Sequence, residues 1–178
     1  MRIIAGSMRG QRLEAPPGDR VRPTLDRVRE SLFNILAPRL AEATFLDLYA
    51  GSGANGIEAL SRGATRAVFI DNHPQSARCI RKNLEKLKCE DRGNCMSYRL
   101  PEDLRRIPGT FSLIFADPPF EFTDHTALLQ AISDADLLAP DGQLIVEHGF
   151  KSDLPEEVGR FRRVQERRYG KTELTFYA

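Results

Sequence analysis

The sequence predicts an α/β fold in which a mostly parallel β-sheet carries helices on both faces. Short apolar runs typical of buried strands alternate along the chain with amphipathic helical patterns. A glycine-rich turn joins the first clear strand to the helix after it, and two final strand-like runs around Gly170 and Lys171 indicate a closing hairpin. With 41% hydrophobic residues in 178, we expect one domain spanning 1–178.

The first forty residues are expected to form a small hairpin and one helix. Two short strand-like runs and an Ala-Pro-Pro-Gly break make residues 1–20 a hairpin extension followed by a loop. Apolar residues then recur with helical period over 28–36. Either Thr24 or Asp26 can cap this helix, and Pro38 is predicted to end it.

The remaining elements follow in alternation. Strands are expected at 44–49, 66–71, 94–98, 111–116 and 143–147, with the final hairpin at 161–168 and 172–177. Helices are expected after the glycine turn, over 74–87 and over 124–138, while Pro140-Asp141-Gly142 is interpreted as a turn.

The glycine turn carries the first functional signal. Gly51, Gly53 and Gly56 have the spacing of loops whose backbone takes positive φ angles and approaches a ligand closely. Alone this signal is weak, because many glycine-rich loops bind nothing. Asp47 disfavours a pyrophosphate, since a carboxylate at the strand end repels an anion. It suits a ligand that has ammonium and sulfonium groups and no phosphate, which describes S-adenosylmethionine.

A second acid ends the next strand. Asp71 follows the apolar run 67–70 at the distance where nucleotide-binding folds place an acceptor for ribose hydroxyls. Each aspartate alone can also be a helix cap or a solvated strand-end acid. Asp47 and Asp71 together favour the cofactor interpretation.

The predicted catalytic motif is Asp117, Pro118, Pro119 and Phe120, directly after a clear apolar strand. Two consecutive prolines remove two N–H donors and hold the backbone rigidly, which leaves carbonyl oxygens free to point into a cleft. The amine of a flipped base can donate to the Asp117 carboxylate and the Pro118 carbonyl, while Phe120 stacks on the base. This orients the nitrogen lone pair toward an electrophilic methyl group. The alternative is a turn with a capping aspartate.

Composition bears on cofactors, location and partners. Three cysteines and three histidines lack metal-ligand spacing, so we expect no metal site. Neither a membrane-spanning run nor a secretory signal is seen, so we expect a cytoplasmic protein with no membrane partner. The net charge is only +1, but basic residues gather near both ends. They form either a track for a polyanion or ordinary solvated surface charge.

The motifs at 47–56, 71 and 117–120 resemble those of class I S-adenosylmethionine-dependent methyltransferases that act on amino groups. A more specific block, Arg22-Pro23-Thr24 with Asp26 to Asn34, closely resembles the bacterial 16S ribosomal RNA guanine-N2 methyltransferase family called RsmD. The opening Arg-Ile-Ile-Ala-Gly and the closing Gly-Lys-Thr extend this resemblance over nearly the whole chain.

The resemblance implies a Rossmann-like, seven-stranded mostly parallel sheet with a short N-terminal β-hairpin extension. It implies methyl transfer from S-adenosylmethionine to the exocyclic N2 of one guanine, with S-adenosylhomocysteine as product and no metal. The substrate would be 16S rRNA within the assembling or assembled 30S subunit, and we expect a monomer. Two alternatives stay open, a DNA adenine-N6 methyltransferase and a non-catalytic rRNA-binding assembly factor.

Site residues follow from the resemblance position by position. The predicted cofactor contacts are Asp47, Tyr49, Gly51, Ser52, Gly53, Asp71 and Asn72. The predicted RNA contacts are Arg9, Arg12, Arg27 and Arg29, although a cofactor-carboxylate contact or an ion pair with Glu30 is open for the last two. The chain departs from the family pattern at Tyr98-Arg99-Leu100-Pro101, where an adenine-contacting acid or amide is usual.

Overall fold

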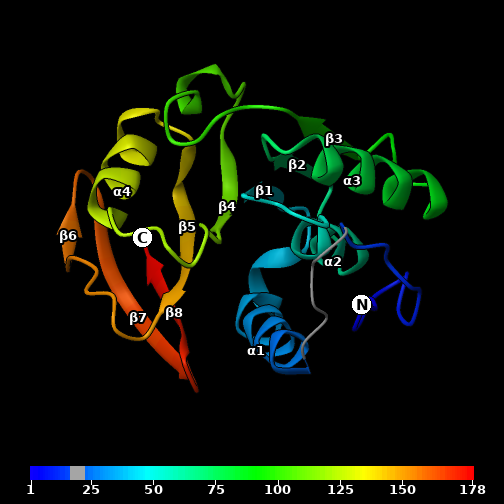
Figure 1. The fold of residues 1–178 in the computed structure, drawn as a ribbon, viewed down its shortest axis with the longest axis horizontal. Helices are drawn as coiled ribbons and strands as arrows, with labels where there is room; N and C mark the ends of the chain where they lie inside the picture. Colours follow the sequence, from blue (N-terminus) through cyan, green and yellow to red (C-terminus); the bar gives the residue numbers. More distant parts are fainter. Residues whose placement is uncertain (17–22) are drawn as a thin grey trace.

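The computed structural model describes residues 1–16 and 23–178 and shows one mixed sheet with helices on both sides (Figure 1). The strands are β1 Thr44–Leu48, β2 Arg66–Ile70, β3 Gly93–Met96, β4 Phe111–Ala116, β5 Leu138–Gly149, β6 Glu157–Val158, β7 Phe161–Tyr169 and β8 Thr172–Tyr177. The helices are α1 Pro23–Leu40, α2 Ala54–Ser61, α3 Pro74–Lys86 and α4 His125–Asp134, with a short 3₁₀ turn at Leu104–Arg106.

The strand order in the sheet is β3-β2-β1-β4-β5-β8-β7-β6. The first five strands run parallel, and β8, β7 and β6 add antiparallel to the β5 edge. Parallel neighbours need crossover connections, which the helices supply. The carboxyl ends of β1, β2, β4 and β5 therefore meet at one edge of the sheet.

Alternation along the strands builds a separate apolar core on each face. Phe45 and Phe69 pack into the core that holds α1, α2 and α3. Leu46 and Val68, each next to one of these phenylalanines in its strand, pack into the other core with α4. Both faces of the sheet are thus covered, and the α/β prediction is confirmed.

The described residues contain eight strands where seven were expected, because two-residue β6 pairs with the start of β7. The N-terminal hairpin is present with minimal pairing. One bridge joins Arg2 to Arg12, and the Ile3 and Gly10 N–H groups donate to the carbonyls of Gln11 and Ile3. Residues 17–20 of the predicted loop lie outside the described residues.

Two predicted breaks do not interrupt their elements. Helix α1 continues past Pro38 to Leu40, because a proline in the last turn removes only one intrahelical hydrogen bond. Strand β5 runs through Pro140-Asp141-Gly142, where the predicted turn was wrong. The pairing with β4 shifts register there, between Phe111 and Leu113, so an irregularity in the strand accommodates the proline.

The observed start of α1 and the observed end of α4 also differ from the predicted ones. Helix α1 begins at Pro23, before either predicted cap. Helix α4 ends at Asp134, four residues before the predicted end, while its predicted start is confirmed by Asp124, whose side chain accepts from the Ala127 N–H.

Buried polar side chains hydrogen-bond the N-terminal segment to helices α2 and α3. The carboxylate of Glu58, on α2, accepts from the backbone N–H groups of Ile4 and Ala5. Asn83, on α3, accepts from the Glu14 N–H and donates back to the Glu14 carbonyl. The chain's first residues are therefore held beside the glycine loop, where Met1 lines a cavity.

Candidate active site

The carboxyl ends of the parallel strands bring together the acids that the sequence singled out. Asp47 lies in β1, Asp71 follows β2, and Asp117 follows β4. The Asp117 N–H donates to the Leu48 carbonyl at 3.3 Å, so the end of β4 stays tied to the end of β1. Open α/β sheets bind ligands at this edge.

The backbone of the glycine loop has the conformation that its sequence predicts. Gly51 and Gly53 have φ angles of 53° and 78°, and Gly53 precedes α2 as its N-cap. A Cβ on Gly51 would meet nothing within 4 Å, so the backbone is open to the cavity there. A Cβ on Gly56 would lie 2.3 Å from Phe69 Cε1, so this third glycine is needed for helix-to-strand packing.

Asp47 holds the loop and does not line the cavity. Its side chain is buried, and Oδ2 accepts from the Gly56 N–H at 2.9 Å, which satisfies one of the unpaired donors at the start of α2. Burial raises the pKa of Asp47 well above its usual value, with smaller contributions from Asp117 and Asp71. The helix-cap alternative describes the observed contact, and the cofactor contact of Asp47 stays a prediction.

Asp71 bridges two elements with its two oxygens. Oδ2 accepts from the Gly51 N–H at 2.9 Å, and Oδ1 accepts from the His73 N–H at 2.8 Å, just before α3. The side chain is half-buried, so it is both fixed and reachable. The neighbouring Asn72 is exposed and lines a separate hollow with Arg99 and Glu102.

A cavity of about 420 Å³, here called the loop-side cavity, lies between α1 and the glycine loop. Its lining includes Tyr49, Gly51 and Ser52 from the predicted cofactor residues. The Tyr49 hydroxyl is buried without a hydrogen-bond partner among the described residues. Burial, followed by the nearby Glu102, raises the pKa of Tyr49 to about 12, so the hydroxyl keeps its proton and can donate to a ligand.

Arg29 also lines the loop-side cavity, and its contact with RNA stays a prediction. The residue is only 6% exposed, and Nη2 donates to the Arg2 carbonyl at 2.7 Å and to Asp26 Oδ1 at 3.0 Å. Its ion pair is therefore with Asp26 and not with Glu30. Nε is buried without a partner among the described residues, and burial lowers the pKa of Arg29. An anion in the cavity would satisfy this donor.

A second cavity of about 560 Å³, the proline-side cavity, opens on the other side of the predicted catalytic motif. It is lined by all four residues of that motif, together with residues of β5 and the turn before β8. Phe120 is 87% exposed. Leaving so much of a phenylalanine ring in water is unfavourable unless the ring contacts another molecule. Asp117, Pro119 and Glu147 line both cavities, so the two meet at these side chains.

Three residues of this region were not assigned a function from the sequence. Glu147 lines both cavities, and His125 and His148 line the proline-side cavity. Rings of Tyr49, Phe122, His125 and His148 follow one another with centroid separations of 6.4, 5.3 and 5.8 Å. The position of Glu147 at the end of the strand beside β4 was the one sequence signal that could have identified it.

The remaining predicted RNA contacts lie away from these cavities. Arg9 and Arg12 are exposed on the N-terminal hairpin, and Arg27 is exposed on α1. None of them is among the residues that line the two cavities. Their contact with RNA stays a prediction.

The described residues offer neither a cluster of metal ligands nor a membrane-spanning helix. They contain no cluster of three or more His, Cys, Asp or Glu side chains that could hold a metal ion. Among the described helices, none has the length and apolar character needed to cross a membrane.

Known proteins resemble this chain along its whole length. A family model described as Conserved hypothetical protein 95 matches residues 1–178. Ribosomal RNA small subunit methyltransferase D of Escherichia coli K12 is 38% identical over 159 residues, covering 87% of this chain and 78% of that protein. YlbH of Bacillus subtilis is 37% identical over 181 residues, covering 99% of this chain and 98% of YlbH.

Solved structures also resemble this chain. The structure of the Escherichia coli protein yhhF has a TM-score of 0.88 at 35% identity and covers 99% of this chain and 96% of its own. SMU.776, crystallised with SAH, shares the fold alone, with a TM-score of 0.70 at 15% identity over 88% of this chain and 50% of its own. By its full-length family match and its curated relatives, the chain belongs to the family of ribosomal RNA small subunit methyltransferase D, the RsmD family.

Proposed function

We propose that the protein transfers a methyl group from S-adenosylmethionine to the exocyclic N2 of a guanine in 16S rRNA of the small ribosomal subunit. The observation that carries this proposal is the meeting of two cavities at Asp117, Pro119 and Glu147. A donor held beside the glycine loop and a base held beside the prolines would have their reacting atoms at that junction. The name of the Escherichia coli relative supports rRNA of the small subunit as substrate.

The loop-side cavity fits S-adenosylmethionine in the chemistry of its side chains. Arg29 has a buried Nε that could bond the carboxylate of the methionine part, and Tyr49 has a buried hydroxyl without a partner among the described residues. Asp71 would accept from the ribose hydroxyls, and the open backbone at Gly51 allows close approach. S-adenosylmethionine supplies the electrophilic methyl group. The complex of SMU.776 with SAH supports this choice only through the shared fold.

The proline-side cavity would hold the acceptor base. Phe120 offers an exposed ring for stacking, and Asp117 offers an acceptor for the amine. The hydrogen bond to Asp117 would aim the nitrogen lone pair at the methyl group. Transfer would form an N–C bond and break the bond between the methyl carbon and sulfur, with S-adenosylhomocysteine as the leaving group. The nitrogen would become cationic and its proton acidic, so Asp117 or water would take that proton. Orientation and electrostatic stabilisation supply the rate enhancement, and no strong base is required.

The test is a methylation assay with tritiated S-adenosylmethionine. The substrates are 30S subunits from a strain lacking the enzyme, free 16S rRNA, and duplex DNA. We expect label in the 30S subunits, and mass spectrometry of the digested rRNA should identify N2-methylguanosine at one position. Label in DNA would favour an adenine-N6 enzyme, and cofactor binding without transfer to any substrate would favour a non-catalytic assembly factor.

A further inference from the structure

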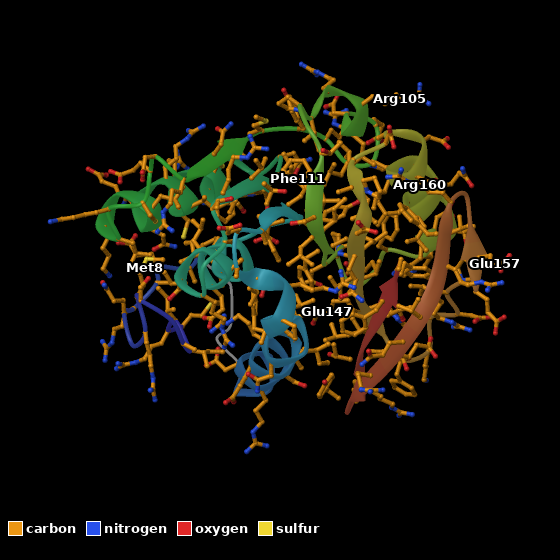
Figure 2. All side chains as sticks on the ribbon, turned by 180° about the vertical axis from the view of Figure 1, so that it is seen from behind. Met8, Arg105, Phe111, Glu147, Glu157 and Arg160 are labelled. Atoms are coloured by element: carbon orange, nitrogen blue, oxygen red, sulfur yellow. The ribbon has the colours of Figure 1, made fainter. Side chains whose placement is uncertain are left out.

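Glu147 lies beside Asp117 across two paired strands. Strands β4 and β5 run parallel and pair Ala116 with Val146, so Asp117 and Glu147 are the next residues on each. Adjacent strands are separated by about 4.8 Å. Both side chains line both cavities, and Figure 2 labels Glu147 on the part of the molecule near α1. The two carboxyl groups therefore face the same junction.

The carboxyl group of Glu147 has no hydrogen-bond donor among the described residues. Its side chain is half-buried, and burial, followed by the charge of Asp117, raises its pKa well above the usual value. The nearest ring on β5, His148, is engaged with Thr175 Oγ1 at 2.7 Å and the Gly149 carbonyl at 3.0 Å. The carboxyl group of Glu147 therefore faces the cavities with oxygens that can accept hydrogen bonds from a ligand.

Guanine carries two neighbouring donors on the edge that would enter this junction. The exocyclic N2 amine is one, and the N1–H group beside it is the other, whereas adenine has an unprotonated N1. If Asp117 accepts from the amine, the N1–H group needs a separate acceptor, because an unpaired buried donor is costly. We propose that Glu147 accepts the hydrogen bond from guanine N1–H and thereby selects guanine as the acceptor base. This assignment rests on the proposed function.

The test compares guanine with 2-aminopurine, placed at the methylated position of 16S rRNA and reconstituted into 30S subunits. The analogue keeps the exocyclic amine but has no N1 proton. For the unaltered enzyme we expect kcat/KM to be at least about tenfold higher on guanine. Glu147→Leu should remove most of that preference, lowering transfer to guanine and leaving transfer to 2-aminopurine within about twofold. Glu147→Gln keeps a carbonyl acceptor and should retain most of the preference.

Two controls separate the possible causes of a lost activity. Thermal unfolding shows whether each variant folds, and calorimetry measures its affinity for S-adenosylhomocysteine, which should be unchanged. An equal loss on both bases would overturn the assignment, and a lost cofactor affinity would mean that Glu147 contacts the methyl donor. If the unaltered enzyme methylates neither kind of subunit, the proposed function itself fails.

Discussion

The two sides of the site differ in how far their predicted contact residues are exposed. Around the loop-side cavity, Asp47 and Asp71 accept from backbone N–H groups, and Arg29 donates to a backbone carbonyl and to Asp26. On the proline side, Asp117 and Phe120 are exposed. Under the proposed function, a small cofactor must be oriented by the protein alone, whereas a base arrives on a large RNA that supplies its own position. The comparison predicts different consequences for variants on the two sides.

The largest effect is expected for Asp117→Ala. Removing the acceptor that orients the amine should lower methyl transfer by roughly 100- to 1,000-fold. Affinity for S-adenosylhomocysteine should stay within about twofold, because the loop-side groups keep their own bonds. Single-turnover assays on 30S subunits measure methyl transfer, and calorimetry measures the affinity for S-adenosylhomocysteine. Glu121→Ala, which removes an exposed acid from the same loop, is the matched control. Equal losses of transfer and cofactor affinity would contradict the division between the two sides.

The opposite pattern is expected for Arg29→Met. Losing a buried charge-assisted bond to the cofactor carboxylate should weaken S-adenosylhomocysteine binding by roughly 10- to 100-fold, since such bonds contribute about 1.5–3 kcal/mol. 5′-Methylthioadenosine lacks that carboxylate, so its affinity should be similar in variant and parent. Arg27→Met, at an exposed position of the same helix, is the control. A parallel fall in affinity for both ligands would point to a general loss of structure at α1.

A smaller effect is expected for Phe120→Ala. Base stacking contributes about 1–3 kcal/mol, so KM for 30S subunits should rise by roughly 5- to 100-fold, with cofactor affinity unchanged. The fold should not lose stability, because the ring is 87% exposed. Val164→Ala, at another exposed apolar position, tests whether any loss of surface hydrophobicity has the same result. A similar KM for both variants would remove Phe120 from the substrate surface.

The sequence predicted which residues lie in this site better than it predicted the directions of their side chains. Asp117 was identifiable because an apolar strand stops there, and Gly51 because its spacing requires an open backbone. The direction of the Asp47 side chain could not be predicted, because a strand-end acid can face a ligand or a helix terminus. Which one it faces depends on where α2 begins. Pro140 looked like a break because the register shift that accommodates it depends on the partner strand.

Arg29 shows a different limit of prediction from the sequence. It stands four residues before Phe33, so it lies on the apolar side of α1, and this spacing could have indicated burial. Its charge favoured a surface role instead. Its actual partners, Asp26 and the Arg2 carbonyl, include one contact from the N-terminal segment that only the assembled fold brings near.

The smallest expected effect concerns stability and the buried Asp47. Because its pKa is raised in the folded protein, the folded state binds more protons than the unfolded chain at pH values between the two pKa values. The free energy of unfolding therefore falls as pH rises above the unfolded value of about 4. Asp47→Asn cannot ionise, so its stability relative to the parent should increase with pH in urea titrations from pH 4 upward. Asp153→Asn, which alters an exposed acid, controls for net charge. A constant difference across this range would mean that Asp47 carries its charge in the folded protein at no cost, and that the loop-side cavity is more hydrated than its burial indicates.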